Sequence, residues 1–371
     1  MTKLVGQHIE NINPYRPGKP IEELERELGI EGAIKLASNE NPLGPSPAAL
    51  DAIGSLIERS HIYPDGAAHR LRSAIAQFHG VPMGEVAVGN GSNELLTLMP
   101  RTFAGPGDHG VVSDHAFVVY RLAMMAQGLD FTSVEMAPGL VHDLEAMKRA
   151  VTPKTRLLFV ANPNNPTGTY VDKASLERLL VEVPEEVVVV VDEAYVEYAQ
   201  ASDFVSALAL RSLRERLIVC RTFSKCYGLA GLRVGYAIGP PQIIGYLNRV
   251  RDPFNANLLG QAAAEAALGD TSFVERSVAV NEEGRRLMED GLGQLESKGV
   301  TWIPSQTNFL LVRTPHAGSD LYDEMLRLGV IVRPMGGYGL DRHLRITIGT
   351  AEQVGRCLDA FEHALNNLEA R

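Results

Sequence analysis

The sequence predicts an α/β fold built on a mostly parallel sheet with helices on both faces. Between about residues 34 and 260, short runs that are apolar at every position alternate with segments of helical pattern. The clearest run is the five valines at 187–191. Strands that are apolar on both faces are typical of a parallel sheet buried between helices. Each run also ends in a polar loop, and ligands of such sheets bind beyond the carboxyl ends of the strands.

The chain of 371 residues is long for a single core, so we expect two lobes and an N-terminal arm. The expected arm spans residues 1–32. Prolines keep it irregular up to residue 20, and a short helix follows over 21–28. A large domain is expected over 33–262. The pattern then changes to strong helix formers and short strands, which predicts a smaller α+β domain over 263–371.

The large domain is expected to repeat a strand, a loop and a helix. Strands are predicted at 85–88, 110–113, 157–161, 187–191 and 217–220, with helices at 94–99 and up to about residue 126 after the first two. In the smaller domain, helices are predicted over 273–298, near 319–328 and over 352–368, and strands near 308–313, 329–333 and 343–348.

Composition narrows the classes of function. A net charge of −10 argues against a broad basic surface for nucleic acid. No apolar run approaches the roughly 20 residues of a membrane span, and no apolar segment follows Met1 as in a secretory signal. The three cysteines, Cys220, Cys226 and Cys357, form no disulfide or metal-binding pattern, which fits a reducing cytoplasm.

Lys225 lies just past the strand predicted at 217–220. Thr222 and Ser224 precede it, and Arg233 follows eight residues later. A lysine in this position can be a nucleophile toward a carbonyl and form a Schiff base. The hydroxyls and the guanidinium suit an anionic group nearby. The alternative is a surface lysine in a loop between a strand and a helix.

Two other strand ends offer complementary groups. Asp192 ends the five-valine strand, where a buried carboxylate needs a cation or a hydrogen-bond donor. The alternative is that Asp192 caps the next helix. The turn at 89–93 (Gly-Asn-Gly-Ser-Asn) lies between a strand and a helix, so its amides favour a phosphate. Glycines also simply make tight turns, and this alternative stays open.

Asn165 and two arginines complete the pattern. Asn165 lies in the loop 162–168, which two prolines stiffen, and its amide can donate to an anionic oxygen. The loop can equally be a stiffened turn without a ligand. Arg333 and Arg345 lie on strands predicted in the small domain. Facing a cleft they suit a carboxylate or phosphate, and facing outward they are solvated.

Together these groups describe one ligand. Lys225 suits an aldehyde, the hydroxyls and Arg233 suit a phosphate, Asp192 suits a ring nitrogen, and Asn165 with Tyr195 suits an anionic oxygen. Pyridoxal 5′-phosphate (PLP) has all four groups.

Motifs along nearly the whole chain resemble the fold-type I pyridoxal-phosphate aminotransferases, and within them the histidinol-phosphate aminotransferase subgroup. The motifs are Asn-Pro-Tyr at 13–15, Ser-Asn-Glu-Asn-Pro at 38–42, Tyr-Pro-Asp at 63–65, the turn at 89–94, and the segments 162–168, 192–195, 222–233 and 344–349.

The resemblance implies PLP as cofactor and a seven-stranded, mostly parallel sheet in the large domain. Lys225 is expected to bind the cofactor covalently and to shuttle a proton. Asp192 is expected to hold the ring nitrogen, and Asn165 with Tyr195 to bond the ring hydroxylate. The other expected cofactor-binding residues are Ser92, Asn93, Phe117, Thr222, Ser224, Arg233 and, from a partner subunit, Tyr63.

The resemblance also implies the substrates: transamination of L-histidinol phosphate, a phosphorylated amine, with 2-oxoglutarate, a 2-oxo acid. A cytoplasmic homodimer with shared active sites is expected, with no nucleic-acid, membrane or metal partner. The expected substrate-binding residues are Tyr15, Asn39, Arg333 and Arg345. Arg345 would take a carboxylate in one half-reaction and share a phosphate with Arg333 in the other. An aromatic-amino-acid aminotransferase, a phosphothreonine decarboxylase and a PLP-binding regulator without turnover remain alternatives.

Overall fold

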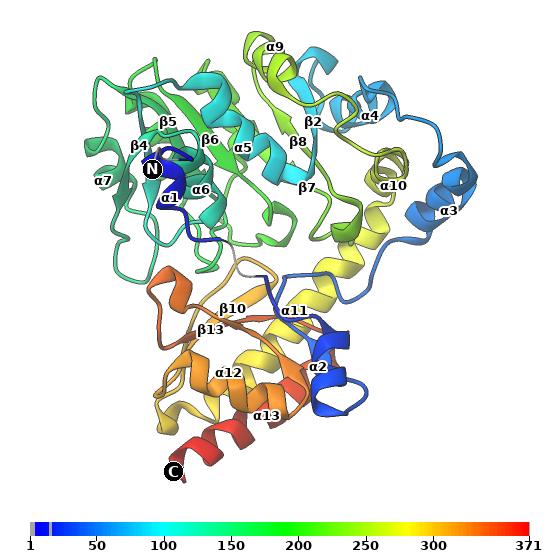
Figure 1. The fold of residues 1–371 in the computed structure, drawn as a ribbon, viewed down its shortest axis with the longest axis vertical. Helices are drawn as coiled ribbons and strands as arrows, with labels where there is room; N and C mark the ends of the chain where they lie inside the picture. Colours follow the sequence, from blue (N-terminus) through cyan, green and yellow to red (C-terminus); the bar gives the residue numbers. More distant parts are fainter. Residues whose placement is uncertain (1–3, 15–16, 371) are drawn as a thin grey trace.

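The computed structural model describes residues 4–14 and 17–370, which form a larger and a smaller lobe (Figure 1). Within these residues, the larger lobe holds a seven-stranded sheet in the order β2-β8-β7-β6-β5-β3-β4. Its strands are β2 (Val86–Asn90), β3 (His109–Ser113), β4 (Asp130–Val134), β5 (Thr155–Ala161), β6 (Val188–Asp192), β7 (Leu217–Thr222) and β8 (Val234–Ile238). Neighbouring strands are parallel except where β8 pairs with β2 and β7. The predicted mostly parallel sheet is therefore confirmed.

Alternate residues of the central strands pack on opposite faces of this sheet, as the unbroken apolar runs predicted. Phe159 and Val190 pack on the face that α5, α6 and α9 cover, whereas Val189 and Val191 pack on the face that α7 and α8 cover. The helices of the larger lobe are α3 (Pro47–Leu56), α4 (His69–His79), α5 (Gly91–Phe103), α6 (Val118–Ala126), α7 (Leu144–Arg149), α8 (Lys173–Glu182), α9 (Pro241–Val250) and α10 (Leu258–Gly269).

The boundaries of α5 and α11 differ from the sequence prediction. Helix α5 begins at Gly91 and not at Glu94, because the glycine-rich turn itself forms the first helical turn. The carboxylate of Glu94 accepts from the backbone N–H of Asn90 at 2.6 Å and so holds that turn. Helix α11 (Thr271–Gly293) ends five residues before the predicted 298, at a segment that contains Gly291 and Gly293.

The smaller lobe is an α+β unit with its own core. A four-stranded antiparallel sheet runs in the order β12-β13-β10-β9, and α11, α12 and α13 lie beside it (Figure 1). The remaining bounds are β9 (Thr301–Ile303), β10 (Phe309–Arg313), α12 (Gly318–Arg327), β12 (Arg333–Pro334), β13 (His343–Thr347) and α13 (Ala351–Glu369). Leu310, Ile346 and Phe361 are among the buried residues of this core.

The N-terminal segment runs along both lobes. Helix α2 (Ile21–Leu28) lies where it was predicted and ends at Gly29, whose φ is +65°. A helical turn, α1 (Gln7–Glu10), corrects the expectation of an irregular chain up to residue 20, because no proline interrupts residues 7–10. Strand β1 (Ile34–Lys35) pairs in parallel with β11 (Val330–Ile331) of the smaller lobe. The domain boundaries at 32/33 and 262/263 stay predictions.

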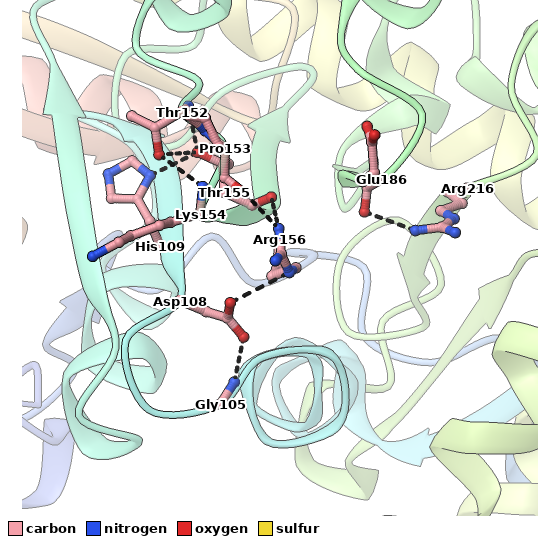
Figure 2. A network of polar contacts seen from close by, with 10 residues as sticks. All are labelled: Gly105, Asp108, His109, Thr152, Pro153, Lys154, Thr155, Arg156, Glu186 and Arg216. Carbon is pink, nitrogen blue, oxygen red and sulfur yellow. Dashed lines mark hydrogen bonds and ion pairs between the residues drawn. The ribbon is translucent and has the colours of Figure 1, made fainter.

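Polar contacts tie together the amino-terminal edge of the large sheet (Figure 2). The guanidinium of Arg156 donates to the carbonyl oxygens of Pro153 and Thr155 and pairs with Asp108 at 3.3 Å. Just before the neighbouring strands β7 and β6, Arg216 donates to the carbonyl oxygen of Glu186 at 2.9 Å. These contacts hold the chain where β5 and β7 begin, at the edge opposite their carboxyl ends.

Candidate active site

A cavity of about 200 Å³ lies at the carboxyl ends of the central strands. It brings together most of the predicted site residues: Asn39, Ser92, Asn93, Phe117, Asn165, Asp192, Tyr195, Thr222, Ser224, Lys225, Arg233, Arg333 and Arg345. Among the described residues, one predicted site residue, Tyr63, does not line it. Tyr63 is 78% exposed and stacks on Phe254 at 4.7 Å between ring centroids. Tyr15 lies outside the described residues.

Lys225 enters the cavity from the loop after β7. Its Nζ donates to the carbonyl oxygen of Ser38 at 3.0 Å, so the amine is held inside and is not a surface lysine. Burial lowers the pKa of Lys225 from 10.5 to about 7, and the neighbouring cations of Arg345 and Arg233 act in the same direction. Near neutral pH a large fraction of this amine is therefore uncharged and able to attack a carbonyl.

Asp192 reaches the cavity from the end of β6 and is buried. Its Oδ2 accepts a hydrogen bond from the hydroxyl of Tyr120 at 2.7 Å, while its buried Oδ1 has no hydrogen-bond partner among the described residues. Burial raises the pKa of Asp192 to about 6, and the bond from Tyr120 opposes that rise. A buried acceptor left open in this way suits a cationic N–H of a ligand.

One end of the cavity is built to hold an anion. Ser92 and Asn93 lie in the first turn of α5, where backbone N–H groups have no partner within the helix. The guanidinium of Arg233 lies against this turn, so closely that a side chain at Gly91 would come within 2.6 Å of it. Thr222 and Ser224 also line the cavity, and Nη1 of Arg233 donates to the hydroxyl of Ser224 at 3.5 Å. Two hydroxyls, a guanidinium and a helix start suit a phosphate group.

Two hydrogen-bonded pairs position Asn165 and Tyr195. Nη1 of Arg345 donates to Oδ1 of Asn165 at 2.7 Å, which orients the amide. Nδ2 of Asn39 donates to the hydroxyl oxygen of Tyr195 at 2.7 Å, so the proton of Tyr195 is directed elsewhere. Burial raises the pKa of Tyr195 to about 12. These hydrogen bonds hold both side chains in fixed orientations inside the cavity.

The two arginines of the smaller lobe face the same cavity. Arg333 and Arg345 are directly opposite each other on the antiparallel strands β12 and β13, which puts their side chains on one face of the sheet. Both line the cavity with Lys225, so the alternative that they face solvent is wrong. This face can receive an anionic group beside the amine.

Sequence reasoning missed Tyr120, which lines the cavity and contacts Asp192. The available signal was its position on α6, three residues after Phe117 and therefore on the same helix face. The carbonyl group of Ser38 was also missed, because a backbone contact leaves no residue-type pattern. Among the described residues, no cluster of His, Cys, Asp and Glu could hold a metal ion.

Comparisons with known proteins agree with this geometry. The family model for aminotransferase class I and II matches residues 31–361. A histidinol-phosphate aminotransferase of Anaeromyxobacter sp. (strain Fw109-5) is 48% identical over 363 residues, covering 98% of this chain and 99% of that protein. Histidinol-phosphate aminotransferase 2 of Pseudomonas aeruginosa is 47% identical and covers 96% of each chain.

The fold also matches solved structures. The histidinol-phosphate aminotransferase of Sinorhizobium meliloti, solved in complex with pyridoxal-5′-phosphate, aligns with a TM-score of 0.89 over 99% of both chains at 27% identity.

Proposed function

Because the chain belongs to the class I and II aminotransferases, a family of PLP enzymes, we propose that it transfers the amino group of L-histidinol phosphate to 2-oxoglutarate. The products are imidazole-acetol phosphate and L-glutamate, which places the reaction in histidine biosynthesis. The proposal rests on relatives named histidinol-phosphate aminotransferase, which are 44–48% identical to this chain over nearly its full length. The paired guanidiniums of Arg333 and Arg345 support it, since both substrates are anions.

The cavity fits PLP on its own geometry. The open Oδ1 of Asp192 suits the ring nitrogen, and the start of α5 with Arg233 suits the phosphate. We assign Ser92, Asn93, Thr222 and Ser224 to the same phosphate, Asn165 and Tyr195 to the ring hydroxyl, and Phe117 to the ring face.

When bound, PLP supplies an electron sink for the bonds at the substrate α-carbon. The chain's own groups then move the protons. Nζ of Lys225 would hold the cofactor covalently, and as a free amine it would act as the base and acid that moves the proton of the substrate α-carbon. The lowered pKa of Lys225 suits both its covalent attachment to the cofactor and its role in proton transfer near neutral pH. Asp192 keeps the ring nitrogen protonated while this happens.

Substrate recognition is assigned to Arg345, Arg333, Asn39 and Tyr15. Arg345 takes the carboxylate of glutamate and shares the phosphate of histidinol phosphate with Arg333. Asn39 acts beside them through the hydroxyl of Tyr195. Tyr15 lies outside the described residues and keeps its role as a prediction.

We also propose a cytoplasmic homodimer in which Tyr63 reaches the partner's cofactor. Exposed apolar side chains gather along α3, the segment after it and the loop before α10: Leu50, Ile57, Ile62, Tyr63 and Phe254. An apolar surface of this kind is typical of an interface between subunits.

The three cysteines are buried free thiols, which a reducing compartment preserves. No described helix is long and apolar enough to cross a membrane.

Substrate profiling tests the proposal. We expect kcat/KM for L-histidinol phosphate to exceed that for phenylalanine, and the reverse order would identify an aromatic-amino-acid aminotransferase.

Arg333→Ala should reduce kcat/KM for histidinol phosphate by tenfold or more and kcat/KM for glutamate by much less, since a charged hydrogen bond contributes about 1.5–3 kcal/mol. Equal losses would remove the proposed role of Arg333. Arg313→Ala, which removes an exposed guanidinium from the same sheet, is the matched control.

A further inference from the structure

We infer that Tyr120 is a positioning residue for Asp192. Its hydroxyl donates a hydrogen bond to Oδ2 of Asp192, so that Oδ1 is the carboxylate oxygen left to accept from the ring nitrogen of the cofactor. In doing so Tyr120 keeps the carboxylate ionised at neutral pH. The inference rests on the proposed PLP-dependent function and adds a residue that acts through Asp192 rather than on the substrate.

The ring of Tyr120 is clamped in place. Tyr120 lies on α6 and is completely buried. It stacks on Phe159 of β5 at 5.0 Å with 9° between the ring planes, and the ring of Phe117 meets it edge-on at 5.8 Å. A phenol held on two sides has one position for its hydroxyl, and that position is 2.7 Å from Oδ2 of Asp192.

This contact makes the two oxygens of Asp192 unequal. Oδ2 already accepts a hydrogen bond, whereas Oδ1 is buried and has no partner among the described residues. A ligand N–H therefore meets Oδ1 alone. The rigid phenol also prevents the carboxylate from rotating, so the ring nitrogen finds an acceptor of fixed direction.

The same contact favours the charged form of the carboxylate. Burial pushes Asp192 toward protonation, and the hydrogen bond from Tyr120 is the largest effect that opposes it. Three other groups act more weakly on the pKa of Asp192: the backbone N–H of Ala194 and the amine of Lys225 favour the charged carboxylate, and the neighbouring Glu193 disfavours it. Cys220, its pairing partner on β7, is a buried thiol whose pKa burial and Asp192 raise, so it carries no charge.

The dissociation constant of PLP for the apoenzyme, measured against pH, tests the inference without relying on activity. Affinity should fall as pH drops through the pKa of Asp192, because a protonated carboxyl no longer holds the ring N–H as an ion pair. In Tyr120→Phe the carboxyl protonates at higher pH, so the fall begins earlier. In Tyr120→Phe we expect PLP to bind about tenfold more weakly than in the wild type at pH 6.5, and within about twofold of the wild type at pH 8.5. A tenfold loss is the size expected for a lost hydrogen bond to a charged group.

Tyr170→Phe is the matched control. It removes a tyrosine–aspartate hydrogen bond of the same 2.7 Å length, from Tyr170 to Asp203, at an exposed position away from the cavity. Its pH profile should coincide with that of the wild type. A loss in Tyr120→Phe that is equal at every pH would mean that the hydroxyl does not control the charge of Asp192 and would overturn the inference.

A double variant tests whether Tyr120 affects PLP binding directly or through Asp192. In Asp192→Asn, adding Tyr120→Phe should weaken PLP binding no further, because Tyr120 works through the carboxylate. A further loss of tenfold would overturn the inference. If Tyr120→Phe fails to fold in thermal unfolding, Phe159→Leu keeps the hydroxyl but removes its stacking partner and should show the same pH-selective loss. Failure of the wild-type protein to bind PLP would instead count against the proposed function.

Discussion

The amine of Lys225 offers the most direct test of the electrostatics of the cavity. Burial, together with the cations of Arg345 and Arg233, lowers its pKa from 10.5 to about 7. At pH 7 about half of such an amine is neutral, whereas a lysine with a pKa of 10.5 is neutral in roughly one molecule in 3000. Only the neutral amine attacks an aldehyde, so at pH 7 the cavity should raise the population of the attacking form by about three orders of magnitude over an ordinary lysine.

The rate constant for covalent attachment of PLP to the apoenzyme, followed by absorbance in a stopped-flow instrument, measures this directly. We expect it to rise with pH through about 7 and to level off above pH 8. Arg345→Gln removes a cation that lowers the pKa of Lys225, so the midpoint should move to higher pH, while burial keeps it below 10.5. Each pH unit of movement corresponds to about 1.4 kcal/mol.

Two further variants serve as controls. Arg342→Gln removes an exposed guanidinium three residues from Arg345 and should leave the midpoint unchanged. Lys225→Ala should abolish the covalent step and transamination at every pH, which identifies the titrating amine. A wild-type midpoint above pH 9 would show that the cavity leaves Lys225 with nearly ordinary basicity and would refute the electrostatic argument. An unmoved midpoint in Arg345→Gln would refute the contribution of that cation alone.

Two predictions concern the packing around the loops that carry Asp192 and Lys225: a buried ion pair and a close backbone contact. Arg221→Met leaves the fully buried carboxylate of Glu193 without the guanidinium that contacts it at 2.8 Å, and urea unfolding should show a loss of about 3 kcal/mol; a loss below 1 kcal/mol would contradict this. Gly228→Ala would place Cβ 2.0 Å from the backbone oxygen of Gly44 at a φ of +69°, so thermal unfolding should reveal severe destabilisation. At Gly231 a Cβ meets nothing, so Gly231→Ala should be tolerated.

Some elements could not be predicted from local sequence for physical reasons. Strand β8 (Val234–Ile238) is a short run containing a glycine, and its antiparallel place between β2 and β7 is decided by the sheet rather than by its own pattern. Edge strand β4 (Asp130–Val134) carries polar residues because it is partly exposed, so it lacks the apolar run that revealed the central strands.

What the sequence by itself determined was the parallel sheet and the chemical groups at its strand ends. Five consecutive valines need burial on both faces, and such a strand delivers Asp192 to the edge where ligands bind. The residue types of Lys225, Asp192 and Arg233 then indicated the ligand before any distance was known.

Only the tertiary structure decided which atom and which charge each of these groups presents. Asn165 is oriented by Arg345 from 180 positions away, and Asp192 by Tyr120 from 72. Hydrogen bonds of this kind join side chains that meet only when helix, sheet and smaller lobe pack together. Burial then sets the pKa values of Lys225 and Asp192, because desolvation depends on the whole surrounding core and not on neighbouring residues in the chain.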